Sequence, residues 1–184
     1  MAVKYTNFRG DVYYLHVRQT KKGNPSYYFK KEDDNTDVPS IPEGYEIYEH
    51  PNGRVFLTKK TKKQITNEEI NLVQECMEQH SPIRDFKLDV KKNTIFVYTY
   101  ENPVPFNENP LIVEALSDPK YKTYFTELCF TLIDKENRAF KVEQRKYTGG
   151  KENEWLTLDE SDDLAALVEQ YVQHLGQESF YELR

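Results

Sequence analysis

The chain has 184 residues, of which 30% are charged and 38% hydrophobic, and its formal net charge is −6. This length fits one large domain or two small ones, with enough hydrophobic residues for a buried core. No segment approaches the roughly 18 consecutive apolar residues of a membrane span, and the N-terminus lacks an apolar signal segment. We therefore expect a soluble cytoplasmic protein that does not bind a membrane.

The charge is unevenly distributed along the chain. Residues 1–63 hold 12 Lys and Arg against 8 Asp and Glu, a net of +4, whereas residues 64–184 hold 13 against 23, a net of −10. A basic front can mark a surface that meets an anion. The alternative is that two parts of opposite charge attract each other.

The opening stretch predicts a β-hairpin. From Asp11 to Arg18 one alternating row, Tyr13, Leu15 and Val17, is apolar, and we expect it to be buried. The turn is "TKKGNP", because Gly and Asn tolerate positive φ and Pro cannot lie inside a central strand. The return strand is expected over residues 26–31.

A second hairpin follows a polar loop with two prolines. "GYEIYE" and "RVFLTKK" are the expected strands, and "HPNG" between them suits a type I turn with a left-handed last residue. Residues 1–63 are therefore predicted to form a small antiparallel β subdomain of four short strands. "TKKTKK", residues 58–63, is a basic link to the rest of the chain.

Residues 64–184 are predicted to form an α+β domain. A capping box at Thr66 and Glu69 begins a helix that Ser81-Pro82 ends. A third hairpin is expected over 85–100, and the proline-rich "ENPVPFNENP" that follows is expected to be a surface loop.

Further strands are predicted at about 121–133 and 138–147, then a mobile turn "TGGKENE" and a strand "WLTL". A last helix is indicated by an apolar stripe from Leu164 to Leu175, with Gly176 as its C-terminal glycine. The predicted fold is α+β: a small antiparallel β front, a helix, an antiparallel sheet and a C-terminal helix packed on the sheet.

Motifs for catalysis are missing from the sequence. Cys76 and His80 are four residues apart on the first predicted helix, yet no second pair of ligands stands at metal spacing. We interpret Cys76 and Cys129 as buried free thiols. The chain has no phosphate-binding loop, nucleophile elbow or zinc-protease motif. We therefore expect no catalytic residue, no metal and no cofactor, although an enzyme without a recognisable motif stays an open alternative.

Aromatic and basic residues meet in the first hairpin. The candidate binding residues are Tyr14, His16, Arg18, Lys21, Lys22, Tyr28 and Lys30. We expect Tyr14, His16 and Tyr28 to be exposed, and Lys59, Lys60, Lys62 and Lys63 to extend the basic patch. The first hypothesis is a non-enzymatic adaptor that contacts a partner protein through this front, since tyrosine suits such surfaces. The alternative is a nucleic-acid-binding accessory protein.

Three phrases, "YYLHVRQTKKGNPSYYF", "IPEGYEIYEHPNGRVFL" and "YVQHLGQESFYEL", resemble stretches of uncharacterised bacterial proteins, in order and over about a quarter of the chain. This resemblance implies no activity, cofactor or site residue. A weaker likeness, in shape only, is to the three-stranded DNA-binding domains at the front of phage-type integrases. The chain departs from them because it lacks their catalytic Arg-His-Arg-Tyr set.

Overall fold

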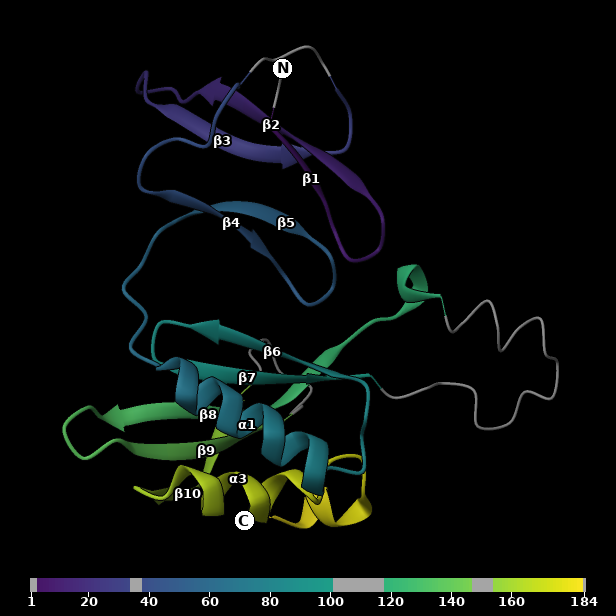
Figure 1. The fold of residues 1–184 in the computed structure, drawn as a ribbon, viewed down its shortest axis with the longest axis vertical. Coiled ribbons are helices and arrows are strands. Elements are labelled where there is room, and N and C mark those ends of the chain that lie inside the picture. The colour runs from purple at the N-terminus through teal and green to yellow at the C-terminus, as the bar shows by residue number, and fades with distance from the viewer. Residues whose placement is uncertain (1–2, 34–37, 101–117, 147–153, 184) are drawn as a thin grey trace, which may run out of the picture. The chain divides into compact units, whose positions relative to one another are not determined.

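The chain forms two compact units in a computed structural model (Figure 1). Unit 1 comprises residues 1–61 and 104–122, and unit 2 comprises residues 62–103 and 123–184. The domain boundary that the sequence predicts between residues 63 and 64 remains a prediction. The structure describes residues 3–33, 38–100, 118–146 and 154–183.

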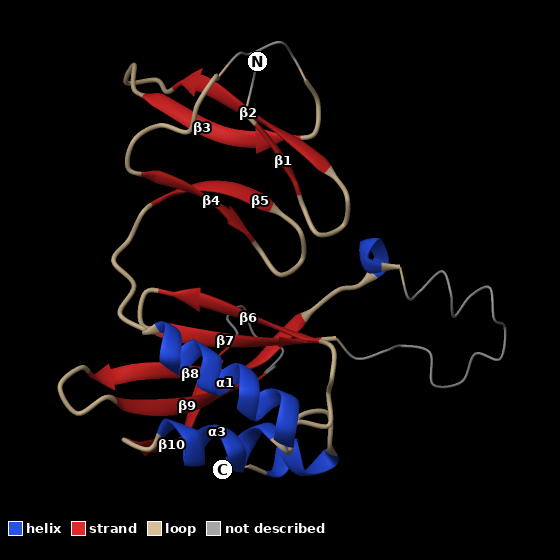
Figure 2. Cartoon of the chain, in the orientation of Figure 1, coloured by secondary structure: helices blue, strands red, loops and turns tan. Residues whose placement is uncertain are grey.

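Unit 1 contains five strands and one short 3-10 helix, η1, among its described residues (Figure 2). A three-stranded sheet has the order β1-β2-β3, and β4 pairs with β5 in a separate hairpin. All three pairings are antiparallel. The bounds are β1 Lys4–Thr6, β2 Val12–Gln19, β3 Pro25–Lys30, β4 Tyr45–Glu49, β5 Val55–Lys59 and η1 Pro119–Tyr121.

Both predicted hairpins of the front are confirmed, and their turns use glycine as expected. Gly23 and Gly53 have φ of 80° and 76°, a region that L side chains rarely adopt. At Gly53 the space is also closed, because an added Cβ would lie 2.9 Å from Nδ2 of Asn7. Strand β1 was missing from the prediction, since three residues are too few for an alternation to stand out.

The β4–β5 hairpin packs on one face of the β1–β3 sheet. Tyr5 donates its hydroxyl to Oε2 of Glu49 at 2.7 Å, and Asn7 donates Nδ2 to the carbonyl oxygen of Gly53 at 2.7 Å. Leu15 is fully buried on this covered face. Val17 belongs to the same row but is 38% exposed, so the expectation that all three apolar residues of β2 are buried is wrong.

Unit 2 has a five-stranded antiparallel sheet in the order β10-β9-β8-β7-β6. Helices α1 and α3 lie on one face of it, and Phe130, Phe140 and Phe180 are almost fully buried in the core that results (Figure 1). These two helices and the three antiparallel sheets confirm the predicted α+β class for the described residues. The bounds are α1 Asn67–His80, β6 Phe86–Lys91, β7 Thr94–Thr99, β8 Phe125–Asp134, β9 Ala139–Lys146, β10 Glu154–Ser161, α3 Leu164–Val172 and a 3-10 helix, η2, Glu178–Glu182.

Helix α1 begins and ends where the sequence predicts. Thr66 and Glu69 form the capping box, and Ser81 is the C-cap. Helix α3 is shorter than predicted, because it ends at Val172. Leu175 lies in a tighter turn after it, in which the Leu175 amide donates a hydrogen bond to the carbonyl oxygen of Val172. Leu175 is nevertheless fully buried, so its place in the apolar stripe is right although its conformation is not α-helical.

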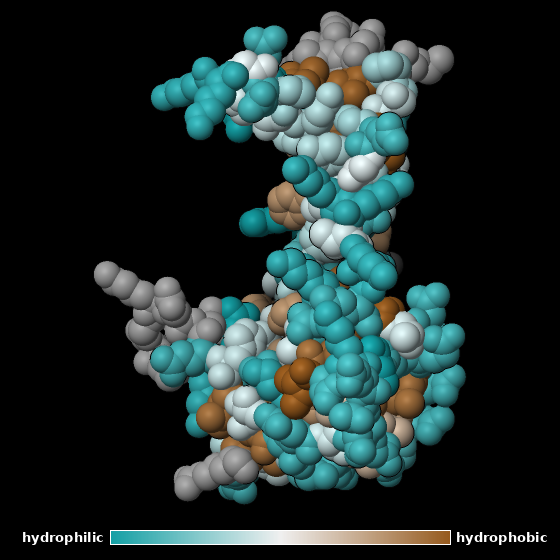
Figure 3. Space-filling model, turned by 90° about the vertical axis from the view of Figure 1, so that its left-hand side faces the viewer, coloured by the Kyte–Doolittle hydropathy of each residue, from teal (hydrophilic) through white to brown (hydrophobic). Residues whose placement is uncertain are grey.

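The expected loop "ENPVPFNENP" and the expected turn "TGGKENE" lie outside the described residues, except for Glu154. Within the described part of the chain, no helix is long and apolar enough to cross a membrane. On the face drawn in Figure 3, hydrophilic side chains predominate in both units, and hydrophobic ones form small separate patches. Single exposed hydrophobic residues are ordinary on protein surfaces.

Candidate functional site

Five of the seven candidate binding residues lie on one face of the β1–β3 sheet. In the register of β2 and β3, Tyr14 is opposite Lys30 and His16 is opposite Tyr28, and Arg18 follows two residues further along β2. This face is the one opposite to Leu15, because side chains alternate along a strand. We call it the aromatic–basic face, comprising Lys4, Tyr14, His16, Arg18, Tyr28 and Lys30.

His16 differs from its prediction. Its side chain was expected to be exposed, but it is only 2% exposed. The ring stacks on Tyr28 with centroids 5.5 Å apart, and Nε2 is 2.9 Å from the carbonyl oxygen of Glu32. Alternation places His16 on the correct face, yet it does not reveal that Tyr28 and the chain after β3 cover this position. His16 therefore supports the surface from beneath.

Two cations of this face lie against tyrosine rings. The guanidinium of Arg18 is 5.6 Å from the ring centroid of Tyr28, and Nζ of Lys4 is 5.4 Å from that of Tyr14. Both cations are exposed, and Tyr28 is 39% exposed, as expected. Tyr14 was also expected to be exposed, but it is partly buried. Such contacts attract a cation to the ring and restrict the side chain to fewer rotamers.

The other cations of the hairpin have different surroundings. Lys21 and Lys22 are exposed in the β2–β3 turn and make no ion pair with any described acid. Lys30 lies 2.5 Å from a carboxylate oxygen of Glu32. Lys31 directly follows β3 and hydrogen-bonds to Asp11, which lowers the pKa of the Asp11 carboxyl and raises that of Lys31.

Lys59, Lys60, Lys62 and Lys63 were expected to extend the basic patch of the first hairpin, but within unit 1 they do not join the aromatic–basic face. Lys59 ends β5 and Lys60 follows it. The β4–β5 hairpin packs on the face that carries Tyr5 and Tyr27, not on the aromatic–basic face. Residues 62 and 63 belong to unit 2. By contrast, sequence reasoning missed Lys4, which joins Tyr14 and Lys30 in one cross-strand row. Its only signal was the brief alternation in "VKYT", too short to identify a strand.

Geometries that resemble catalytic pairs in unit 2 have structural explanations. Nδ1 of His174 is 2.8 Å from the Ser179 hydroxyl, but the two are five residues apart in one turn, as in a local turn contact. His80 has Nδ1 3.7 Å from a carboxylate oxygen of Glu169. Among the described residues no group of three His, Cys, Asp or Glu side chains could hold a metal.

Both cysteines are free thiols, and Cys129 is buried. Cys76 is only partly buried, so the expectation that both thiols are buried is correct for Cys129 alone. Burial, and then the nearby Glu143 carboxylate, raise the pKa of Cys129 to about 12. A thiol with this pKa is protonated at neutral pH and is a poor nucleophile.

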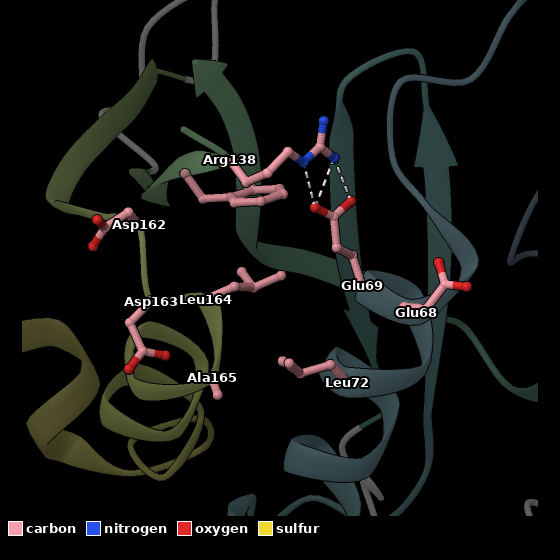
Figure 4. A pocket seen from close by; sticks show the side chains of 9 residues that line it. Glu68, Glu69, Leu72, Arg138, Asp162, Asp163, Leu164 and Ala165 are labelled. Atoms are coloured by element: carbon pink, nitrogen blue, oxygen red, sulfur yellow. Dashed lines mark hydrogen bonds and ion pairs between the residues drawn. The ribbon is translucent and has the colours of Figure 1, made fainter. Parts of the chain in front are cut away.

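A hollow of about 400 Å³ opens in unit 2 between the first turns of α1 and α3 (Figure 4). At its rim Arg138 donates Nε and Nη2 to the Glu69 carboxylate at 2.6–2.8 Å. Glu68 lies at one end of the hollow, and Asp162 and Asp163 lie at the other, so these carboxylates do not converge on a common point. The hollow offers no set of groups arranged for catalysis or for binding a cation.

No protein-family model, no curated protein and no solved structure matches this chain. On the aromatic–basic face, the exposed cations Lys4 and Arg18 each lie against a tyrosine ring.

Proposed function

We propose that this protein is a binding module that contacts a partner protein through the aromatic–basic face of unit 1. The observation that carries the proposal is the pairing of exposed cations with tyrosine rings: Arg18 on Tyr28 and Lys4 on Tyr14. Arginine and tyrosine are enriched among the residues that dominate protein–protein binding energies. Because these contacts already restrict the side chains of Arg18 and Lys4, binding of a partner would cost less of their conformational entropy.

Binding of nucleic acid is the alternative function. It is favoured by Lys21 and Lys22, which are exposed at the tip of a two-stranded ribbon and could contact phosphates. It is disfavoured by the rings themselves. Tyr28 already contacts both His16 and Arg18, so its ring is less accessible to a stacking base than the ring of an isolated tyrosine.

The test is capture of partners from a lysate of the native cells on the immobilised full chain. The decisive variant is Arg18→Glu combined with Lys21→Glu, and the matched control is Lys59→Glu with Lys60→Glu. Both variants reverse two exposed charges of unit 1, but only the first alters the region of the aromatic–basic face. We expect a protein that the wild type and the control retain and the first variant loses, with or without nuclease treatment.

Two results would contradict the proposal. If nuclease removes all retention, the alternative function is correct. If the two double variants retain the same proteins equally well, the aromatic–basic face is not the binding surface.

An enzyme without a recognisable motif is the second alternative. Its support would be a concave site with convergent polar groups and ionisable groups of altered pKa. The described hollow in unit 2 lacks that convergence (Figure 4).

A further inference from the structure

The aromatic–basic face has its cations and its rings in rows across the strands. Lys4, Tyr14 and Lys30 are cross-strand neighbours and form the first row. His16 and Tyr28 form the second row, two residues further along β2, and Arg18 marks the third. Positive charge therefore stands at both ends of the face, and an exposed ring stands between.

The spacing of these rows matches that of an extended peptide. A strand rises roughly 3.3 Å per residue, so the first and third rows are about 13 Å apart, with the second row midway. An extended chain running along β2 presents its side chains at every second residue to the sheet below, with the same repeat. Residues i, i+2 and i+4 of such a peptide would meet the first, second and third rows.

The chemistry of the rows indicates which side chains fit. A guanidinium that lies on a ring can present a pair of N–H groups to a carboxylate, which is the bidentate geometry that arginine favours. The first row already holds one carboxylate, because Lys30 binds Glu32 at 2.5 Å. Between these charges, Tyr28 is 39% exposed, and the part of its side chain that His16 and Arg18 leave uncovered can contact an apolar side chain, although it offers no free face for a stacking base.

We infer that the partner contributes an extended acidic segment, with two acidic residues four positions apart and an apolar residue midway between them. This inference rests on the proposed function and specifies its ligand. The acidic residues meet Lys4 and Arg18, and the apolar residue lies on Tyr28. Complementary charge of this kind favours specificity and rapid association.

Titration of the isotope-labelled full chain with synthetic peptides, followed by NMR, tests this inference. The first probe is Gly-Ser-Glu-Thr-Leu-Thr-Glu-Ser-Gly, and the second is Gly-Ser-Thr-Glu-Glu-Thr-Leu-Ser-Gly, with the same composition but adjacent acids. A single-stranded oligonucleotide is the third. We expect the first peptide to bind about tenfold more tightly than the second, with shifts at the amides of Tyr14, His16, Arg18 and Tyr28.

Variants separate the face from the rest of unit 1. Arg18→Glu should weaken binding of the first peptide about tenfold, and Lys60→Glu should change it less than about twofold, since Lys60 lies outside the face. Both side chains are exposed, so both variants should fold, and the amide spectrum of each confirms it.

The outcomes that overturn this inference differ from those that overturn the proposed function. The inference of an acidic segment is refuted if the two peptides bind equally well or if neither binds. The proposed function would still hold in that case if a partner protein is retained by the wild type and lost only by the variant with Arg18→Glu and Lys21→Glu. If the oligonucleotide binds more tightly than both peptides and shifts the same amides, the inferred ligand is wrong and the nucleic-acid alternative gains support.

Discussion

In unit 2, Phe130, Phe140 and Phe180 are almost fully buried between two helices and a five-stranded sheet. Among the described residues of unit 1, only one apolar side chain, Leu15, is buried to the same extent. Polar contacts such as Asn7 with Gly53 and Tyr5 with Glu49 take a larger part there. Apolar burial is therefore the main stabilising contribution in unit 2, whereas unit 1 depends on directional bonds.

The difference explains where the surface aromatics are found. Unit 1 comprises 80 residues, and a unit of this size has little interior, so much of its aromatic surface stays accessible. In unit 1 these rings are ordered by stacking and by cations, as in the contacts of Tyr28 with His16 and Arg18. A surface that is both accessible and ordered is well suited to binding.

The largest expected effect is on the core of unit 2. Phe130→Ala should lower the free energy of unfolding by about 4 kcal/mol, because it leaves a cavity in the centre of the sheet. Fluorescence of Trp155, the single tryptophan of the chain, follows the unfolding of unit 2 in denaturant. Phe125→Ala on the same strand is the control, since Phe125 is 58% exposed, and it should cost less than about 0.5 kcal/mol. Equal losses would refute apolar burial as the main contribution.

In unit 1 the largest destabilisation is expected when a buried polar side chain, that of Asn7, is removed. Asn7→Ala should destabilise unit 1 by about 2–3 kcal/mol, because Asn7 accepts the amides of Arg9 and Asp11 and donates to Gly53. Hydrogen exchange of the Leu15 amide measures the loss.

Asn24→Ala, in an exposed turn of the same unit, should leave that exchange nearly unchanged. If Asn7→Ala shifts the unfolding curve of Trp155 as much as it accelerates exchange in unit 1, the two units are not distinct in stability.

A polar contact also matters in unit 2, but less than its core does. Glu69 caps α1 and binds Arg138, and its side chain is only 14% exposed. Glu69→Ala should cost about 2 kcal/mol, since it removes the cap and leaves a partly buried guanidinium without its carboxylate. Glu68→Ala, at an exposed neighbouring site without the ion pair to Arg138, should cost much less than Glu69→Ala. Urea unfolding followed through Trp155 distinguishes them, and equal costs would show that the ion pair contributes nothing.

The last effect is absent at neutral pH and concerns the thiol of Cys129. Its pKa in the folded protein is raised to about 12, above that of an unfolded chain, so the fold favours the protonated form. The resulting stability is fully present below the unfolded pKa of roughly 8.5 and is lost as pH rises towards 12. Relative to Cys129→Ala, the wild type should lose about 1.4 kcal/mol per pH unit between roughly pH 9 and 11. Urea unfolding at several pH values measures this difference, and parallel pH profiles would contradict the predicted burial effect.

Local patterns in the sequence predict much of the fold. The capping box at Thr66 and Glu69, the glycine turns at Gly23 and Gly53, and the apolar stripe of α3 act over a few residues, and each is where it was expected. The capping box determines where α1 begins, and the glycine turns determine where the chain reverses direction, so α1 and the two hairpins were predicted well.

Contacts between distant residues were not predictable in the same way. Arg138 binds Glu69 across 69 positions, and Arg138 also adopts a positive φ of 54° in a turn that its sequence does not mark. His16 is buried by Tyr28 and by the backbone after β3, neither of which alternation can indicate. For the candidate site, alternation placed residues on the right face but did not predict their exposure.

The bonds of Asn7 to Gly53 and of Phe8 to Glu49 have a consequence for biosynthesis. They join positions 46 and 41 residues apart, so the first turn of the chain lacks these partners when it leaves the ribosome. The turn between β1 and β2 can form these hydrogen bonds only after Gly53 has been translated and has emerged from the ribosome. Unit 1 therefore closes late relative to its own synthesis, and a nascent chain halted before this point exposes the aromatic residues of its first strands to chaperones.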